Sequence, residues 1–162
     1  MKALLASLAV VALFASGCPS AYQKTYDEET ARLEAQQRMR EQQMAAERQE
    51  AHKYVAIPLF AVGSDELDDA AFREIDWFLD KIAPYPHVEI ELKGYTDSTG
   101  SEATNEPLSN KRAWNVQDYM VSRGIAPDRI SASGYGATDP ARPNVTPDGR
   151  VQNRRAEIRV RL

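Results

Sequence analysis

The spacing of apolar residues alternates between a helical period and a strand period along residues 54–162, and this limits the folds open to the chain. One group recurs every three or four residues, as on the buried face of a helix: Leu67, Ala71, Ile75, Phe78 and Ile82. Shortly afterwards Val88, Ile90 and Leu92 alternate with charged residues, which is the period of a half-buried strand. The chain is therefore predicted to mix helices with strands.

The same criteria predict the remaining elements of this region. The apolar run from Val55 to Phe60 is typical of a strand, and a second helix is expected from Leu108 to Arg123, with Gly124 as its C-terminal cap. Two further strands are expected over 130–135 and 156–162, and polar loops over 96–107 and 136–153. The order βαβαββ predicts an α+β fold, a two-layer sandwich with helices on one face of a mixed sheet.

The first residues indicate export. Lys2 precedes an apolar run from Ala3 to Ala15, followed by small residues and Cys18. This is the pattern of a signal peptide, here residues 1–17, and it is too short for a transmembrane helix of ~20 residues. Since Cys18 is the only cysteine, no intramolecular disulfide can form.

The run from Phe14 to Cys18 resembles a bacterial lipoprotein box, in which the cysteine is acylated and becomes the first residue of the mature protein. That family prefers Leu where this chain has Ala15. The alternative is an ordinary signal peptide with a chance cysteine. We expect Cys18 to be lipidated and to attach the protein to a membrane, because two or more acyl chains anchor stably.

Between Cys18 and the C-terminal region lies a segment expected to set the reach of the chain. Residues 18–26 are predicted to be an extended tether, and 27–53, which lack Gly and Pro, a helical spacer. Glu28 with Arg32, and Glu34 with Arg38, have the i,i+4 spacing that supports an exposed helix. Apolar positions hold no heptad pattern, so a solvated spacer is favoured over a helical bundle. As a helix the spacer would span roughly 40 Å.

Composition and motifs argue against several classes of function. A formal net charge of -4 lacks the basic footprint of a nucleic-acid-binding protein. His52 lies in the polar spacer and His87 follows Pro86, and neither has a partner at metal-ligand spacing. No nucleophile elbow or P-loop occurs. We therefore expect no enzyme activity, no cofactor and no metal, with both histidines at the surface.

The informative motifs lie around Asp97 and Arg112. Asp97 belongs to Gly-Tyr-Thr-Asp-Ser-Thr-Gly-Ser at 94–101, in a glycine-containing loop that lets backbone approach a ligand. Asn105 and Leu-Ser-Asn-Lys-Arg-Ala at 108–113 follow, then Gly-Tyr-Gly at 134–136, Pro140, Asn144 and Asn-Arg-Arg at 153–155. A strand–loop–helix turn can bring Asp97 and Arg112 to one concavity. One negative and one positive group there complement a zwitterionic amino acid.

These motifs closely resemble the OmpA-like peptidoglycan-binding domain family, over about residues 55–162. The family includes peptidoglycan-associated lipoproteins and the periplasmic part of flagellar stator subunits. The resemblance implies that Asp97, Asn105, Arg112 and Arg155 bind the diaminopimelate of the peptidoglycan stem peptide, with Ser64 as a further contact through its side chain or backbone. It also implies a lipoprotein of the outer membrane with its domain in the periplasm, and Tol-type envelope proteins as candidate partners.

Each of these residues has an alternative interpretation. Asp97 and Arg112 could pair with each other as a loop staple, and Asn105 could form a turn. Arg155 could be a surface charge before the last strand, and for Arg154 that interpretation is favoured. For the whole chain, the alternative function is a structural oligomer held by the spacer. Peptidoglycan hydrolysis ranks third, since no constellation for it is found.

Overall fold

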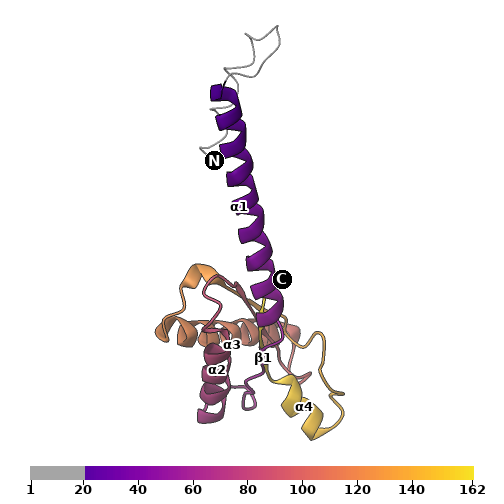
Figure 1. Cartoon of the computed structure of the whole chain (residues 1–162). Helices are drawn as coiled ribbons and strands as arrows, with labels where there is room; N and C mark the ends of the chain where they lie inside the picture. The colour runs from indigo at the N-terminus through magenta and orange to yellow at the C-terminus, as the bar shows by residue number, and fades with distance from the viewer. Residues whose placement is uncertain (1–20) are drawn as a thin grey trace. The chain divides into compact units, whose positions relative to one another are not determined.

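The structure is a computed structural model that describes residues 21–162. The predicted signal peptide and Cys18 lie outside these residues. The chain divides into two compact units, residues 1–42 and 43–162. The first is represented by most of helix α1, and the second contains the last turns of α1 together with the sheet and its helices (Figure 1).

Helix α1 spans Ala21–Ala51 and is exposed over most of its length. It begins earlier than predicted, so residues 21–26 are helical where an extended tether was expected. Its C-terminal end belongs to the second unit, because Ala51 is fully buried in the hydrophobic core. The carbonyl oxygen of Val160 accepts a hydrogen bond from His52 Nδ1 at 2.6 Å. His52 is thus a docking contact and only partly exposed, where a fully solvated side chain was expected.

The sheet has four strands in the order β1-β4-β2-β3. They are β1 (Val55–Ala56), β2 (Ile90–Gly94), β3 (Ile130–Gly134) and β4 (Ala156–Val160). Strands β2 and β3 are parallel, and β4 runs antiparallel to both β2 and β1. With α2 (Asp69–Ile82) and α3 (Glu102–Ser122) this gives the predicted order βαβαββ, and the α+β fold is confirmed.

Alternation along the strands separates the two faces of the sheet. The buried residues of β2 and β4 join the apolar stripes of α2 and α3 in one core, whose members include Ile75, Phe78, Leu92, Val116, Met120 and Ile158. The intervening residues are charged, and on the other face Lys93 pairs with Glu91 at 2.9 Å and Arg159 with Glu157 at 2.9 Å. Both helices therefore cover a single face, as in a two-layer sandwich.

Two glycines let α3 lie close against the C-terminal ends of strands β2 and β3. A Cβ atom at Gly94 would lie 2.0 Å from the Ser109 carbonyl oxygen, and one at Gly134 would lie 2.3 Å from the Asn110 amide nitrogen. Any side chain at either position would force the helix away from the sheet. The first half of α3 is held in this way over the loop that follows β2.

Prolines account for most of the differences from prediction within residues 54–162. Strand β1 covers only Val55–Ala56 because Pro58, which has no N–H to donate, interrupts the ladder. Helix α3 begins at Glu102 and contains Pro107, which was expected to end the loop before the helix. The 136–153 loop contains an unpredicted helix, α4, at Pro147–Asn153. A 3-10 turn at Pro127–Arg129 precedes β3.

Candidate functional site

A small cavity of about 130 Å³ lies where the loop after β2 meets the first half of α3. Its polar lining includes Thr96, Asp97, Asn105, Arg112 and Arg154. It is smaller than the ~300–1,000 Å³ pockets that enclose whole small molecules, so it can take only one end of a ligand.

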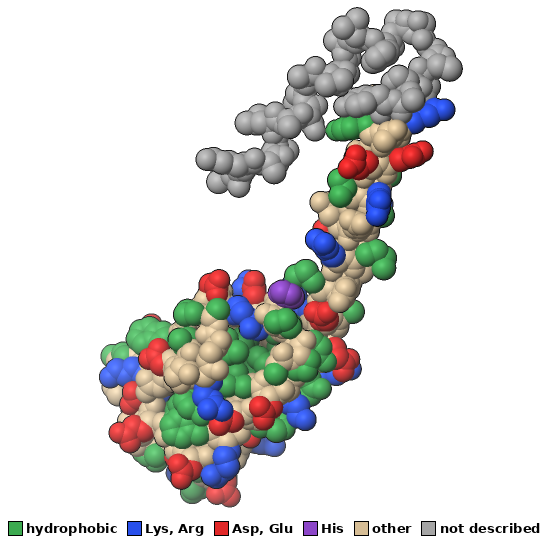
Figure 2. Space-filling model, turned by 60° about the vertical axis from the view of Figure 1, so that its left-hand side comes forward, with side chains coloured by type: hydrophobic (Ala, Val, Ile, Leu, Met, Phe, Trp, Pro, Cys, Tyr) green, Lys and Arg blue, Asp and Glu red, His purple; other side chains and the backbone are tan. Residues whose placement is uncertain are grey.

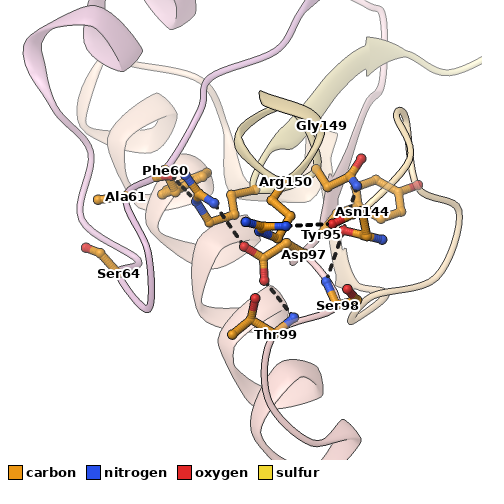
Figure 3. Close-up of polar contacts among 12 residues, drawn as sticks. Phe60, Ala61, Ser64, Tyr95, Asp97, Ser98, Thr99, Asn144, Gly149 and Arg150 are labelled. Carbon is orange, nitrogen blue, oxygen red and sulfur yellow. Dashed lines mark hydrogen bonds and ion pairs between the residues drawn. The ribbon is translucent and has the colours of Figure 1, made fainter. Parts of the chain in front are cut away.

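Asp97 is the carboxylate of this cavity, and its side chain is almost fully buried. Its Oδ2 pairs with Arg154 Nη1 at 2.9 Å, and its Oδ1 accepts a hydrogen bond from the Thr99 amide at 2.8 Å (Figure 3). Burial disfavours the charged form, but the hydrogen bonds from Arg154 and Thr99 outweigh it and lower the pKa of Asp97 below its usual value. Asp97 is therefore ionised at neutral pH.

Arg112 forms the floor of the cavity and is fully buried. It donates from Nε to the Ser64 carbonyl at 2.8 Å, from Nη1 to the Tyr95 carbonyl at 2.7 Å and from Nη2 to the Ala61 carbonyl at 3.1 Å. Burial and the nearby charge of Arg154 lower its pKa to about 10, so it stays protonated at neutral pH. A guanidinium has five N–H groups, and two of them remain for another acceptor.

The cavity carries an excess of positive charge. Arg112 and Arg154 both line it, while its one lining carboxylate, Asp97, is paired with Arg154. A buried charge without a partner is unfavourable, and an incoming anion relieves it. The arrangement therefore favours a carboxylate, while the free lone pairs of Asp97 can accept from an ammonium group.

The structure brings Asp97, Asn105 and Arg112 together as predicted. The alternative that Asp97 pairs with Arg112 is not observed, because the ion-pair partner of Asp97 is Arg154. Asn105 lies in the first turns of α3 and is no turn residue; its Nδ2 donates to the Asp97 carbonyl at 3.4 Å. Ser64 contributes through its backbone to Arg112, while its hydroxyl accepts from the Glu66 amide at 3.0 Å.

The structure places Arg154, rather than Arg155, at the cavity. The Arg155 guanidinium stacks over the Tyr95 ring at 3.9 Å and bonds Glu157, away from the cavity. Both arginines are buried, but it is Arg154 that reaches the cavity, so its interpretation as a surface charge was wrong. The signal for this was present in the sequence: neighbouring residues of an extended chain point to opposite faces. Arg154 lies two residues before Ala156, the first buried residue of β4, and so points to the same face as the buried residues. Arg155 lies two residues before Glu157 and points to the face of the charged residues.

The 136–153 segment braces the Asp97 loop. Asn144 Oδ1 accepts from the Ser98 amide at 3.1 Å and from Asn153 Nδ2 at 2.8 Å, and the Asn144 carbonyl accepts from Arg150 Nη1 at 2.8 Å (Figure 3). A Cβ atom at Gly149 would lie 2.0 Å from the Pro143 carbonyl oxygen, so α4 packs tightly on its own loop. These contacts fix the backbone on which Asp97 is carried.

Helix α4 was missed in the sequence, although its start carries a recognisable signal. Thr146 is its N-cap and accepts from the Gly149 amide at 3.0 Å, and Pro147 occupies the first turn, where proline is favoured. Within residues 21–162 there is no helix long and apolar enough to cross a membrane, and no group of three or more His, Cys, Asp or Glu side chains suited to a metal ion.

Comparisons with known proteins agree on one family. The model of the OmpA family matches residues 59–154. The peptidoglycan-binding protein ArfA of Mycobacterium bovis is 44% identical over 102 residues, which are 62% of this chain but 31% of that protein, so the chain spans less than a third of its length.

Two solved structures have the same fold. The C-terminal domain of Helicobacter pylori MotB has a TM-score of 0.61 at 29% identity, with 65% of this chain and 84% of that chain covered. The peptidoglycan-associated lipoprotein of Burkholderia pseudomallei has a TM-score of 0.62 at 23% identity, with 65% and 90% covered.

Proposed function

Because the chain belongs to the OmpA family, we propose that its C-terminal domain binds peptidoglycan non-covalently, through the free amino-acid end of a stem-peptide diaminopimelate. The observation that carries the proposal is the charge of the small cavity, which is lined by two arginines and one aspartate. The name of the relative ArfA, a peptidoglycan-binding protein, supports the same ligand.

The end of diaminopimelate carries one carboxylate and one ammonium group. The carboxylate would accept hydrogen bonds from the two remaining N–H groups of Arg112, with Arg154 beside it. The ammonium group would donate a hydrogen bond to Asp97. Such charge-assisted hydrogen bonds are about twice as strong as neutral ones. Asn105, at the rim, can bond the ligand through its amide. Lysine, which replaces diaminopimelate in some walls, lacks the second carboxylate and would leave the arginines unpaired.

Recognition of this kind is local. Acidic and basic side chains are interspersed over the visible face of the domain, and the formal net charge of the chain is -4 (Figure 2). General attraction to an anionic wall is therefore absent, and affinity at one site is modest because few groups engage. Many copies in one membrane would still hold the cross-linked polymer through multivalency.

We also propose that Cys18 is acylated and that the protein is an envelope lipoprotein joining the outer membrane to the wall. The lipoprotein-box-like run that ends at Cys18 supports this. Helix α1 would then be the spacer between the lipid and the wall-binding domain. No catalytic step is part of the proposal, and Tol-type partners stay a prediction.

Sedimentation of the protein with purified sacculi tests the proposed function. The full chain in detergent should sediment with diaminopimelate-containing sacculi, and free meso-diaminopimelate should release it. Sacculi that carry lysine at the same position should retain much less. The proposal is contradicted if the protein does not sediment with the sacculi, or if it stays bound to them at saturating free diaminopimelate.

A further inference from the structure

A groove of about 550 Å³ adjoins the small cavity and lies outside the site proposed for the diaminopimelate end. The two hollows share Gly100 and Asn105, so one rim separates them. One wall of the groove is the first turns of α3, with Glu102 and Glu106, and the other is the segment after β3, with Tyr135. A ligand that leaves the cavity over this rim enters the groove.

The groove has the opposite charge to the cavity. Glu102 and Glu106 lie one turn apart on α3 and are both exposed, and its lining contains no Lys or Arg. Within residues 21–162 neither carboxylate takes part in an ion pair. A third carboxylate placed there would be repelled by both.

The opposite wall offers a fixed aromatic surface. Tyr135 is 40% exposed, and its ring stacks on the nearly buried ring of Tyr95 with centroids 5.6 Å apart. Since Tyr95 is itself held under the Arg155 guanidinium, the Tyr135 ring is backed by a rigid layer. A pre-positioned ring of this kind packs against the planar peptide groups of a ligand at little entropic cost.

Building on the proposed function, we propose that this groove holds the stem-peptide residues next to diaminopimelate, and that Glu102 and Glu106 make it selective for stems whose neighbouring carboxylate is masked as an amide. Diaminopimelate enters the cavity by one end only, so the rest of the stem must continue past the shared rim. The adjacent D-glutamate is joined through its side chain and keeps a free carboxylate unless it is amidated. An amide removes the repulsion and can donate to the glutamates.

Binding of two synthetic tripeptides by the full chain in detergent tests this. One is L-alanyl-γ-D-glutamyl-meso-diaminopimelate, and the other is its counterpart with the D-glutamate carboxylate amidated. Free meso-diaminopimelate serves as the reference ligand. Repulsion from two exposed charges corresponds to a preference of about three- to tenfold for the amidated peptide. In Glu102→Gln/Glu106→Gln the preference should vanish, because the carboxylate peptide gains affinity.

The matched control is Glu29→Gln/Asp118→Asn, which removes two exposed acidic charges that do not line the groove. It should keep the wild-type preference. Tyr135→Ala should weaken both tripeptides and leave free diaminopimelate unaffected.

Equal affinity of the two peptides for the wild-type chain overturns the inference, as does a preference that survives in the glutamine variant. If free diaminopimelate itself does not bind, the proposed function fails instead, and the inference with it.

Discussion

At the scale of single residues, the proposed binding cavity has one carboxylate, Asp97, in a lining that contains two arginines. Asp97 is paired with Arg154 and lies in the same cavity as Arg112. In the free protein it offsets part of their charge, and with ligand bound it would also accept from the ammonium group. Removal of this carboxylate therefore affects stability through the lost pair with Arg154, and binding through the lost contact with the ligand ammonium group. The two effects can be measured separately.

We predict that Asp97→Asn lowers the affinity for free meso-diaminopimelate at least about thirtyfold. Loss of one partner of a buried, charged contact costs ~2–5 kcal/mol. Calorimetric titration at neutral pH, at a temperature where thermal unfolding shows the variant folded, measures the loss. Asp128→Asn removes an exposed carboxylate outside the cavity and should bind normally. A folded Asp97→Asn protein with full affinity contradicts the mechanism.

The same carboxylate predicts how stability depends on pH. The pKa of Asp97 is lower in the folded protein than its ordinary value. Its contribution to stability is thus fully present above the ordinary pKa, and it is lost as pH falls through the lowered value. Urea unfolding of wild type and Asp97→Asn should differ most at neutral pH and converge below about pH 4. A difference that is constant across that range would show that ionisation of Asp97 is not the cause.

The residues of the cavity were predictable to different degrees. Asp97, Asn105 and Arg112 belong to a motif whose residue order and spacing can be recognised from the sequence alone. Arg154 was misjudged because two adjacent arginines before a strand look equivalent. They can be told apart only by extending the in-and-out alternation of the strand back to both residues. The pairing of Asp97 with Arg154 could not be derived from the sequence, since it depends on where the 136–153 segment folds back.

At the scale of elements, periodicity predicted both helices of the sandwich and the alternation of the central strands. A proline was the reason that the start of α3 was predicted at the wrong residue. Pro107 was taken as the end of a loop, yet α3 passes through it at the cost of one backbone hydrogen bond. The turns before Pro107 carry Asn105 and both glutamates of the groove. The shift of the helix start therefore matters for binding as well as for topology.

Helix α1 is divided between the two units, and this predicts the effect of truncation. We predict that deletion of residues 21–42 changes neither stability nor binding to sacculi, because these residues lie outside the second unit. Deletion extended through Lys53 removes the buried Ala51 and the bond from His52 to Val160, and should lower the free energy of unfolding by about 1–3 kcal/mol. Urea unfolding of the two truncated proteins makes the comparison. Equal stabilities would show that the last turns of α1 do not support the core.

At the scale of the whole molecule, the proposed function combines two weak attachments. In this proposal a single cavity would give modest affinity for the wall, and the lipid would keep many copies at one surface, where their sites act together. A spacer helix between the two sets how far the wall can lie from the membrane. The anchor is therefore as necessary as the cavity, although its cysteine lies outside the described residues.

We predict that Cys18→Ser separates these two attachments. Without a thiol no acyl chain can be added, so the variant should remain unprocessed or become a soluble periplasmic protein. Two acyl chains at ~0.8 kcal/mol per buried methylene hold a protein through a high-salt wash, whereas charge contacts do not survive it. Fractionation of cells after such a wash, with incorporation of labelled palmitate as a second readout, measures the change. The purified variant should still bind sacculi as the wild-type domain does, because the cavity is untouched. Membrane retention of Cys18→Ser after the wash would mean that another part of the chain provides the anchor.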